Sequence, residues 1–271
     1  MNFSRVVAVL RREAQEILKS RGLMLTVFLP PILLTLLPLI AVAVLGRVIE
    51  AEAGNSPGDA SDLGPMVSQM PELANWSVGE VTMFVILNQF LVFFLMMPLI
   101  VSMTIAAQSI VGEKQSKSLE PLLATPIKTS ELLFAKALAA MLPAVVATWT
   151  GFLIFVIVGR FLIESDRVYG AILNPKWLVA MLILAPLLAL LAVSVTVVIS
   201  SRVNDTRTVQ QIAGFLVMPI VVLGVAQTTG LILLNAFTFI IGAIVVAILD
   251  ALILQIGVRL FRRERILTQW K

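Results

Sequence analysis

The chain alternates long apolar runs with short polar segments. A helix needs about 20 apolar residues to cross the hydrocarbon core of a bilayer, and four uncharged runs each provide one crossing. A fifth run, broken only at Asp250, is long enough for two crossings with a turn near Gln227–Gly230. The pattern therefore predicts six spans, at roughly 23–45, 81–110, 132–159, 177–200, 207–226 and 236–258.

A separate helix is predicted before the first span. Apolar side chains recur there at three- and four-residue steps, at Phe3, Val6, Val7, Leu10, Ala14, Ile17 and Leu18. Basic residues fall largely on the other face, so residues 1–22 are expected to form an amphipathic helix on the membrane surface. Such a helix is either a simple anchor or an elbow helix that transmits motion into the first span.

Composition agrees with a membrane protein. The 271 residues are 59% hydrophobic and 13% charged, with a mean hydropathy of +1.01, whereas a soluble domain carries about 25% charged residues. The predicted fold class is an all-α membrane protein, with residues 23–271 as its transmembrane domain. Cysteine and histidine are both absent, which excludes disulfides, thiolate or imidazole metal sites and Ser-His or Cys-His catalysis. We therefore expect no enzyme and no metal site.

The basic residues predict the orientation. Only four of the twenty Lys and Arg fall in segments on one side of the six spans, namely Arg47, Arg160, Arg167 and Lys176. The other sixteen lie on the side of the two termini, which the positive-inside rule places in the cytoplasm. The expected location is the inner (plasma) membrane, spanned several times. The extracytoplasmic loop 46–80 is acidic, and it is either a solvated loop or a vestibule that attracts cations.

The polar segment 112–129 begins like a phosphate-binding loop. Such a loop reads G-x-x-x-x-G-K-[ST] and joins a strand to a helix. Here Lys117 replaces the second glycine, and the segment follows a membrane span, so we expect this chain to bind no ATP and no other cofactor. Leu119, Leu122 and Leu123 instead form an apolar patch with a charged rim. Such a patch suits helix-in-groove docking, although it also suits a connector packed on its own bundle.

The same stretch carries a family resemblance. The residues are Glu113, Ser118-Leu119-Glu120, Leu122-Leu123, Thr125-Pro126-Ile127, Glu131-Leu132 and Lys136. They resemble the signature of ABC type-2 export permeases, the membrane subunits of ATP-driven exporters, including sodium- and drug-export permeases. The six spans and the elbow helix are similar to that family along the whole chain.

The resemblance implies a mechanism and partners. Two permease copies or homologues would pair around a substrate path in the membrane lipid, with no nucleic acid involved. Two cytosolic ATPase subunits, which bind ATP and Mg, would dock on the loops Gly112–Thr129 and Ser200–Arg207. The docking residues expected in this chain are Glu113, Lys117, Leu119, Glu120, Leu122, Leu123, Arg202 and Asp205. The family also often has short re-entrant helices before the last span, for which Val225–Asn235 is the candidate.

Polar residues inside the spans are further candidates. Asn88, Gln89 and Thr148 either line a path or join helices by hydrogen bonds. Asp250 is the only acid within a span, and it either pairs with Lys136 or a C-terminal arginine, or lines the path. Two other classes of protein remain as alternatives. A secondary transporter needs inverted repeats and a midplane ion site, and a membrane anchor or assembly subunit needs no path.

Overall fold

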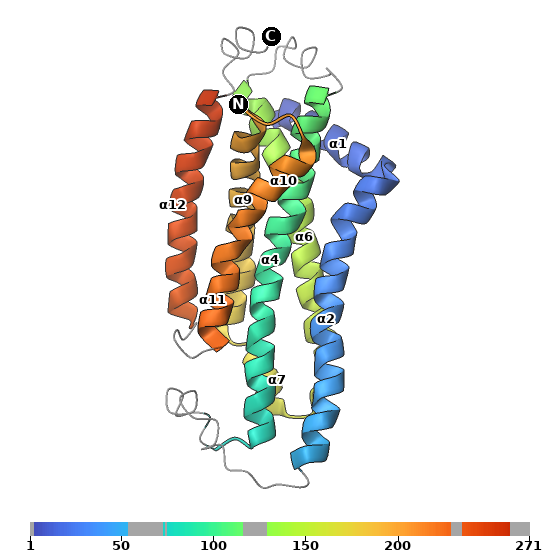
Figure 1. Cartoon of the computed structure of the whole chain (residues 1–271), viewed down its shortest axis with the longest axis vertical. Helices are drawn as coiled ribbons and strands as arrows, with labels where there is room; N and C mark the ends of the chain where they lie inside the picture. The colour runs from blue at the N-terminus through green and yellow to red at the C-terminus, as the bar shows by residue number, and fades with distance from the viewer. Residues whose placement is uncertain (1–2, 54–72, 74, 116–128, 229–234, 261–271) are drawn as a thin grey trace.

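The computed structural model describes residues 3–53, 73, 75–115, 129–228 and 235–260. These residues form a bundle of helices and contain no strand (Figure 1). The helices are α1 (Phe3–Lys19), α2 (Arg21–Ala53), α4 (Val78–Gln115), α6 (Thr129–Leu162), α7 (Asp166–Ile172), α8 (Pro175–Val179), α9 (Ala185–Ser200), α10 (Thr206–Gly214), α11 (Met218–Thr228) and α12 (Ala236–Leu260). The predicted all-α class is confirmed.

Six segments are long and apolar enough to cross a membrane, as predicted. They are Val27–Val48, Val78–Gln115, Glu131–Leu162, Asp166–Ser200, Thr206–Gln227 and Ala236–Gly257. The protein is therefore a multi-pass membrane protein. Most of the loop 46–80, most of the segment 112–129 and most of the candidate re-entrant segment lie outside the described residues.

Helix α4 is the centre of the bundle. It contacts α2, α6, α9, α10 and α11, and 78% of its most apolar 18 residues are buried, against 17% in α12. Its buried side chains lie all round the helix, from Val81 to Val111, which is expected of a helix enclosed by others. The outer helices bury one side only and leave large apolar side chains exposed on the other.

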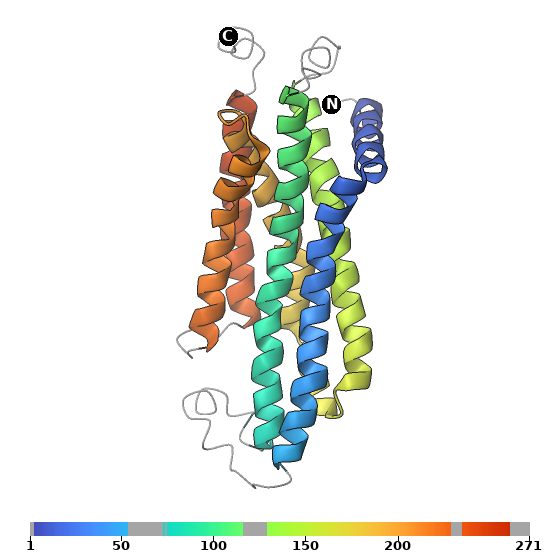
Figure 2. The same ribbon diagram turned by 45° about the vertical axis from the view of Figure 1, so that its right-hand side comes forward.

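Helix α1 lies across one end of the bundle, turned away from the direction of α2 (Figures 1 and 2). We call this end of the bundle the α1 end; it also holds the start of α6, the end of α4 and the turn between α9 and α10. Val6 and Val9 of α1 pack against Leu132 and Ala135 of α6. The amphipathic pattern of the sequence thus places the apolar face of α1 on the bundle.

The fourth span is irregular. Between α8 and α9 lies a π-helical turn, η3 (Ala180–Leu184), in which the Ala185 N–H donates to the Ala180 carbonyl five residues back. In the same register the Met181 carbonyl would accept from Pro186, which has no N–H. The indole N–H of Trp149 on α6 donates to that carbonyl instead, at 2.8 Å. The irregular turn is thereby satisfied inside the membrane, and α6 is joined to the fourth span.

The fifth span also changes direction. The turn η4 (Phe215–Val217) separates α10 from α11, and α11 approaches α4 closely at Gly224. A Cβ built on Gly224 would lie 3.0 Å from Val92 Cγ1 and 3.1 Å from Gln89 Nε2. The absence of a side chain therefore allows the two helices to meet at this point.

Replacing Gly224 with valine should force α11 away from α4. Overpacking of this kind costs about 1–3 kcal/mol, so we expect a lower thermal unfolding midpoint in mild detergent. Gly242→Val is the matched control, because Gly242 also lies in a membrane helix but has nothing within 4 Å of its built Cβ. The helix propensity of valine is common to both variants. Equal midpoints for the two variants would contradict the close approach.

Candidate functional site at the α1 end

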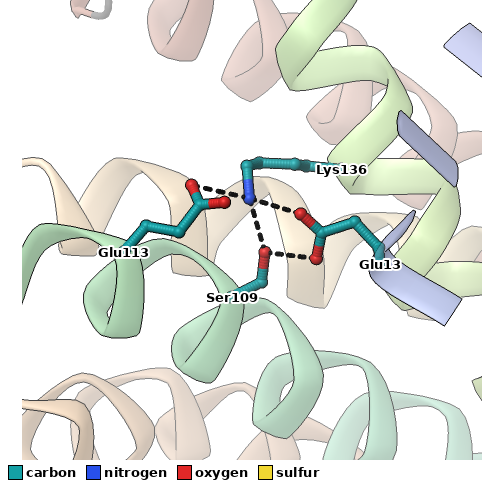
Figure 3. Close-up of polar contacts among 4 residues, drawn as sticks. All are labelled: Glu13, Ser109, Glu113 and Lys136. Carbon is teal, nitrogen blue, oxygen red and sulfur yellow. Dashed lines mark hydrogen bonds and ion pairs between the residues drawn. The ribbon is translucent and has the colours of Figure 1, made fainter. Parts of the chain in front are cut away.

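A buried charge network joins three helices at the α1 end. The Lys136 ammonium on α6 contacts Glu13 Oε1 of α1 at 2.6 Å, Glu113 Oε2 of α4 at 2.9 Å and Ser109 Oγ of α4 at 2.8 Å. Ser109 in turn donates to Glu13 Oε2 at 2.8 Å. Figure 3 shows the side chains of Glu13, Ser109 and Glu113 converging on the lysine nitrogen. The ammonium donates hydrogen bonds to Glu13 Oε1 and Ser109 Oγ, and Glu113 Oε2 adds an ion pair without hydrogen-bond geometry.

The network is almost closed to solvent. Glu13 and Lys136 are each 5% exposed and Glu113 is 7% exposed. Two carboxylates around one ammonium leave an excess of negative charge in the network. Removing such ions from water costs several kcal/mol each, and the contacts with Lys136 offset that cost. The three helices are therefore held together at Lys136.

The other side of α4 holds the turn between α9 and α10. Lys114 Nζ donates to the Ser200 carbonyl and to Asn204 Oδ1, both at 2.8 Å. Gln115 Nε2 donates to the Asn204 carbonyl at 2.9 Å. Apolar packing of α4 on Val209 of α10 supports the same contact. Adjacent residues of α4, Glu113 and Lys114, thus connect the helix end to elements on two sides.

Asp205 begins α10 as its N-cap. Its Oδ2 accepts from the Thr208 hydroxyl at 2.7 Å and from the Thr208 backbone N–H at 2.8 Å. These two hydrogen bonds hold the pKa of Asp205 below its usual range. A lowered pKa means that the charged cap stabilises the fold above the usual carboxyl pKa and is lost as the pH falls through the lowered value. The turn 201–205 is therefore fixed at both ends at neutral pH.

The structure places the predicted docking residues unevenly. Arg202 and Asp205 are exposed on the turn after α9, whereas Glu113 is buried against Lys136. The remaining five, Lys117, Leu119, Glu120, Leu122 and Leu123, lie outside the described residues. Gln115, the last described residue before them, is bonded to the turn after α9. The two predicted docking loops therefore begin side by side.

The polar residues predicted within the spans do not gather at one place. Asn88 is buried and donates to the Phe84 carbonyl, and Thr148 is buried and donates to the Ala144 carbonyl. Both bonds lie within one helix. Gln89 is half-buried beside Gly224. Trp149, beside Thr148 in sequence, makes the bond between helices.

Asp250 on α12 is 3% exposed, and neither of its carboxyl oxygens has a hydrogen-bond partner among the described residues. The predicted alternative of a pair with Lys136 is wrong. Lys136 points toward α1 and α4, whereas α12 packs mainly on α9 and has few contacts with α6. The arginines after residue 260 lie outside the described residues.

Sequence reasoning missed two residues of the site, Glu13 and Ser109, and it did not foresee the contacts of Lys114 with the turn after α9. One signal was present for Glu13, because it lies seven residues after Val6 and four before Ile17, on the apolar face of α1. A charged residue on a buried helix face needs a partner. No comparable signal marks Ser109, since a serine in a membrane helix commonly bonds to its own backbone.

The described residues contain no cluster of three or more side chains suited to bind a metal ion.

Comparison with known families decides the identity of the chain. The family model for ABC-2 family transporter proteins matches residues 7–267, which include every described helix apart from the first residues of α1. The chain belongs to the ABC-2 transporter family. A search of curated proteins found no match. The match supports a role as a permease, the membrane subunit of an ABC transporter. In this ABC-2 protein, the Lys136 network joins α1, α4 and α6 at the α1 end.

Replacing Lys136 with methionine should destabilise the permease strongly. The change keeps the length of the side chain but leaves Glu13 and Glu113 buried without their cation, and breaking a buried pair in this way costs about 3–5 kcal/mol. Arg160→Met is the matched control. Arg160 forms an ion pair with Asp166 at 3.1 Å, and the two side chains are 51% and 84% exposed, respectively. Exposed ion pairs contribute about 0–1 kcal/mol to the stability of the fold.

Unfolding in mild detergent measures both variants, and Glu13→Gln combined with Lys136→Met should recover part of the loss. If Lys136→Met were no more harmful than Arg160→Met, the network would not hold the helices.

Proposed function

We propose that this chain is the membrane-spanning permease of an ATP-driven exporter in the plasma membrane, with the α1 end in the cytoplasm. Two copies, or one copy and a homologue, form the substrate path. Two separate ATPase subunits bind ATP and Mg, and hydrolysis takes place on them. The match to the ABC-2 family supports the class, and the distribution of Lys and Arg supports the orientation.

One observation carries the coupling proposal. The end of α4 is bonded on one side to α1 and α6 through Lys136, and on the other side to the turn after α9 through Lys114. It leads directly into the segment 116–128, which carries the proposed docking patch. A force applied to that segment acts on both helices that it joins, α4 and α6, and α4 contacts every other span except the last extensively.

The two connections differ in strength. The Lys136 network is buried and its ammonium contacts carboxylates of both other helices, so α1, α4 and α6 are expected to move as one body. The contacts of Lys114 and Gln115 with Asn204 are exposed, and exposed polar contacts are easily exchanged for water. An ATPase seated on both loops can therefore break or reform the second connection, which moves α9 and α10 relative to α4.

Purification from the native cell tests the proposed partner. The tagged permease, isolated in mild detergent, should retain an ATPase subunit at about one copy per permease, identified by mass spectrometry. Leu119→Glu combined with Leu123→Glu should release that subunit, because two carboxylates cannot enter an apolar groove without losing their hydration.

Leu173→Glu is the control for this experiment. Leu173 is exposed and follows α7 at the opposite end of the bundle, so the same change of side chain there should leave the ATPase bound. A wild-type permease that retains no nucleotide-binding partner at native expression would exclude the proposal. The secondary-transporter and anchor alternatives would then be favoured.

A further inference from the structure

A groove opens on the surface of the bundle between α1, α2 and α6. Its volume is about 550 Å³, within the range of about 300–1,000 Å³ that is usual for ligand sites. It forms because one face of α6 carries small or ring-shaped residues at every fourth position, namely Ala139, Pro143, Ala147 and Gly151. Among the described residues that line it, only Thr35 and Thr150 have polar side chains. The occupant must therefore present hydrocarbon.

The position of the groove limits what that occupant is. The α2 wall extends from Phe28 to Leu36, eight steps of about 1.5 Å or about 12 Å along the helix. Half of the hydrocarbon core is about 15 Å, so this wall covers a single leaflet. Leu10 and Ala14 of α1 line the groove as well, and α1 lies across the end of the bundle (Figure 1). The α6 wall is longer, from Ala139 to Ile154, fifteen steps or about 22 Å along the helix. One leaflet together with its headgroup region is about 20–22 Å thick, so the groove begins beside α1 and is about as long as one lipid.

A second permease copy fits this shape less well. A spanning helix of a partner would continue past the α1 end and collide with α1, whereas a lipid tail ends there at its headgroup. Wider apolar faces are also available for a second copy on the fifth span, Thr206–Gln227, and on α12, where only 22% and 17% of the most apolar residues are buried. A lipid therefore fits the groove between α1, α2 and α6 better than a second permease copy does.

The charge of α1 selects the headgroup. Arg11 lies between the lining residues Leu10 and Ala14 and is exposed, and Lys19 is exposed at the end of the helix. The carboxylate of Glu13 points the other way, into the Lys136 network. Cations beside an interfacial helix attract anionic lipids. We infer that the groove between α1, α2 and α6 binds one acyl chain of an anionic phospholipid from the leaflet on the α1 side, with its phosphate beside Arg11.

Photolabelling of the unaltered protein tests the site. The permease is reconstituted in vesicles of phosphatidylcholine and phosphatidylglycerol, in which the phosphatidylglycerol carries a photoreactive group on one acyl chain. Labelled peptides should come from 28–36 and 139–154 several-fold more often than from the equally exposed face of α12. Labelling spread evenly over the exposed faces of α6, α11 and α12 would show only general solvation by lipid and would overturn the inference.

A matched pair of variants tests the groove itself. Ala147→Trp fills the groove with an indole, and Ala247→Trp makes the same change on the exposed face of α12, away from the groove. Native mass spectrometry of the detergent-purified protein should show a retained phosphatidylglycerol in the wild type and in Ala247→Trp, and a several-fold loss in Ala147→Trp. Equal retention by the two variants would contradict the site.

Two further variants test the headgroup and the choice of occupant. Arg11→Glu should shift retention from phosphatidylglycerol toward phosphatidylcholine, and an unchanged preference would remove the proposed role of Arg11. Val146→Cys introduces a thiol into a chain that has no cysteine. A disulfide-linked dimer of this variant, with no lipid label in the groove, would show that a second copy covers it and would overturn the inference. None of these readouts requires an ATPase partner, so they stand apart from the proposed function.

Discussion

The structure depends on one buried ammonium. Lys136 lies where water is nearly absent, so its charge is tolerated only while Glu13 and Ser109 accept its hydrogen bonds and Glu113 pairs with it. Those acceptors come from α1 and α4, and the lysine comes from α6. Withdrawing α6 would leave both carboxylates without their cation, and withdrawing α1 or α4 would leave the lysine with only one of its two carboxylates. This constraint turns an amphipathic surface helix into a fixed part of the bundle.

The rest of the bundle is held by weaker and more local means. Membrane helices gain little from the hydrophobic effect when they pack, because lipid is as apolar as a side chain, so close approach and isolated hydrogen bonds decide their contacts. Gly224 allows α11 to meet α4, and Trp149 completes the irregular turn before α9. The share of buried residues is highest in α4, at 78%, and next in the fourth span, at 56%, and it falls to 22% in the fifth span and 17% in α12. The bundle is thus packed around α4, with the last two spans at its periphery.

Composition and hydropathy predicted the class of the fold, because the length of an apolar run follows directly from the thickness of the bilayer. They did not predict the neighbours of each helix. Lys136 belongs to the family signature, but its pairing with Glu13 joins residues far apart in the chain, and a single sequence contains no information on which helices lie side by side. Asp250 shows the same limit, since its proposed partner Lys136 proved to face other helices. Asn88 and Thr148 bond to their own helices, an outcome that periodicity does not distinguish from a bond between helices.

The most direct test of the account measures two distances in the permease bound to its ATPase. The chain has no cysteine, so spin labels attach only where cysteines are introduced. One pair joins Gln15 on α1 to Phe134 on α6, and the other joins Phe134 to Gln255 on α12; all three side chains are exposed. On addition of ATP, the account predicts an unchanged distance from Gln15 to Phe134 and a changed distance from Phe134 to Gln255. A change between Gln15 and Phe134 would show that α1 moves independently of α6, and would contradict the central role given to Lys136.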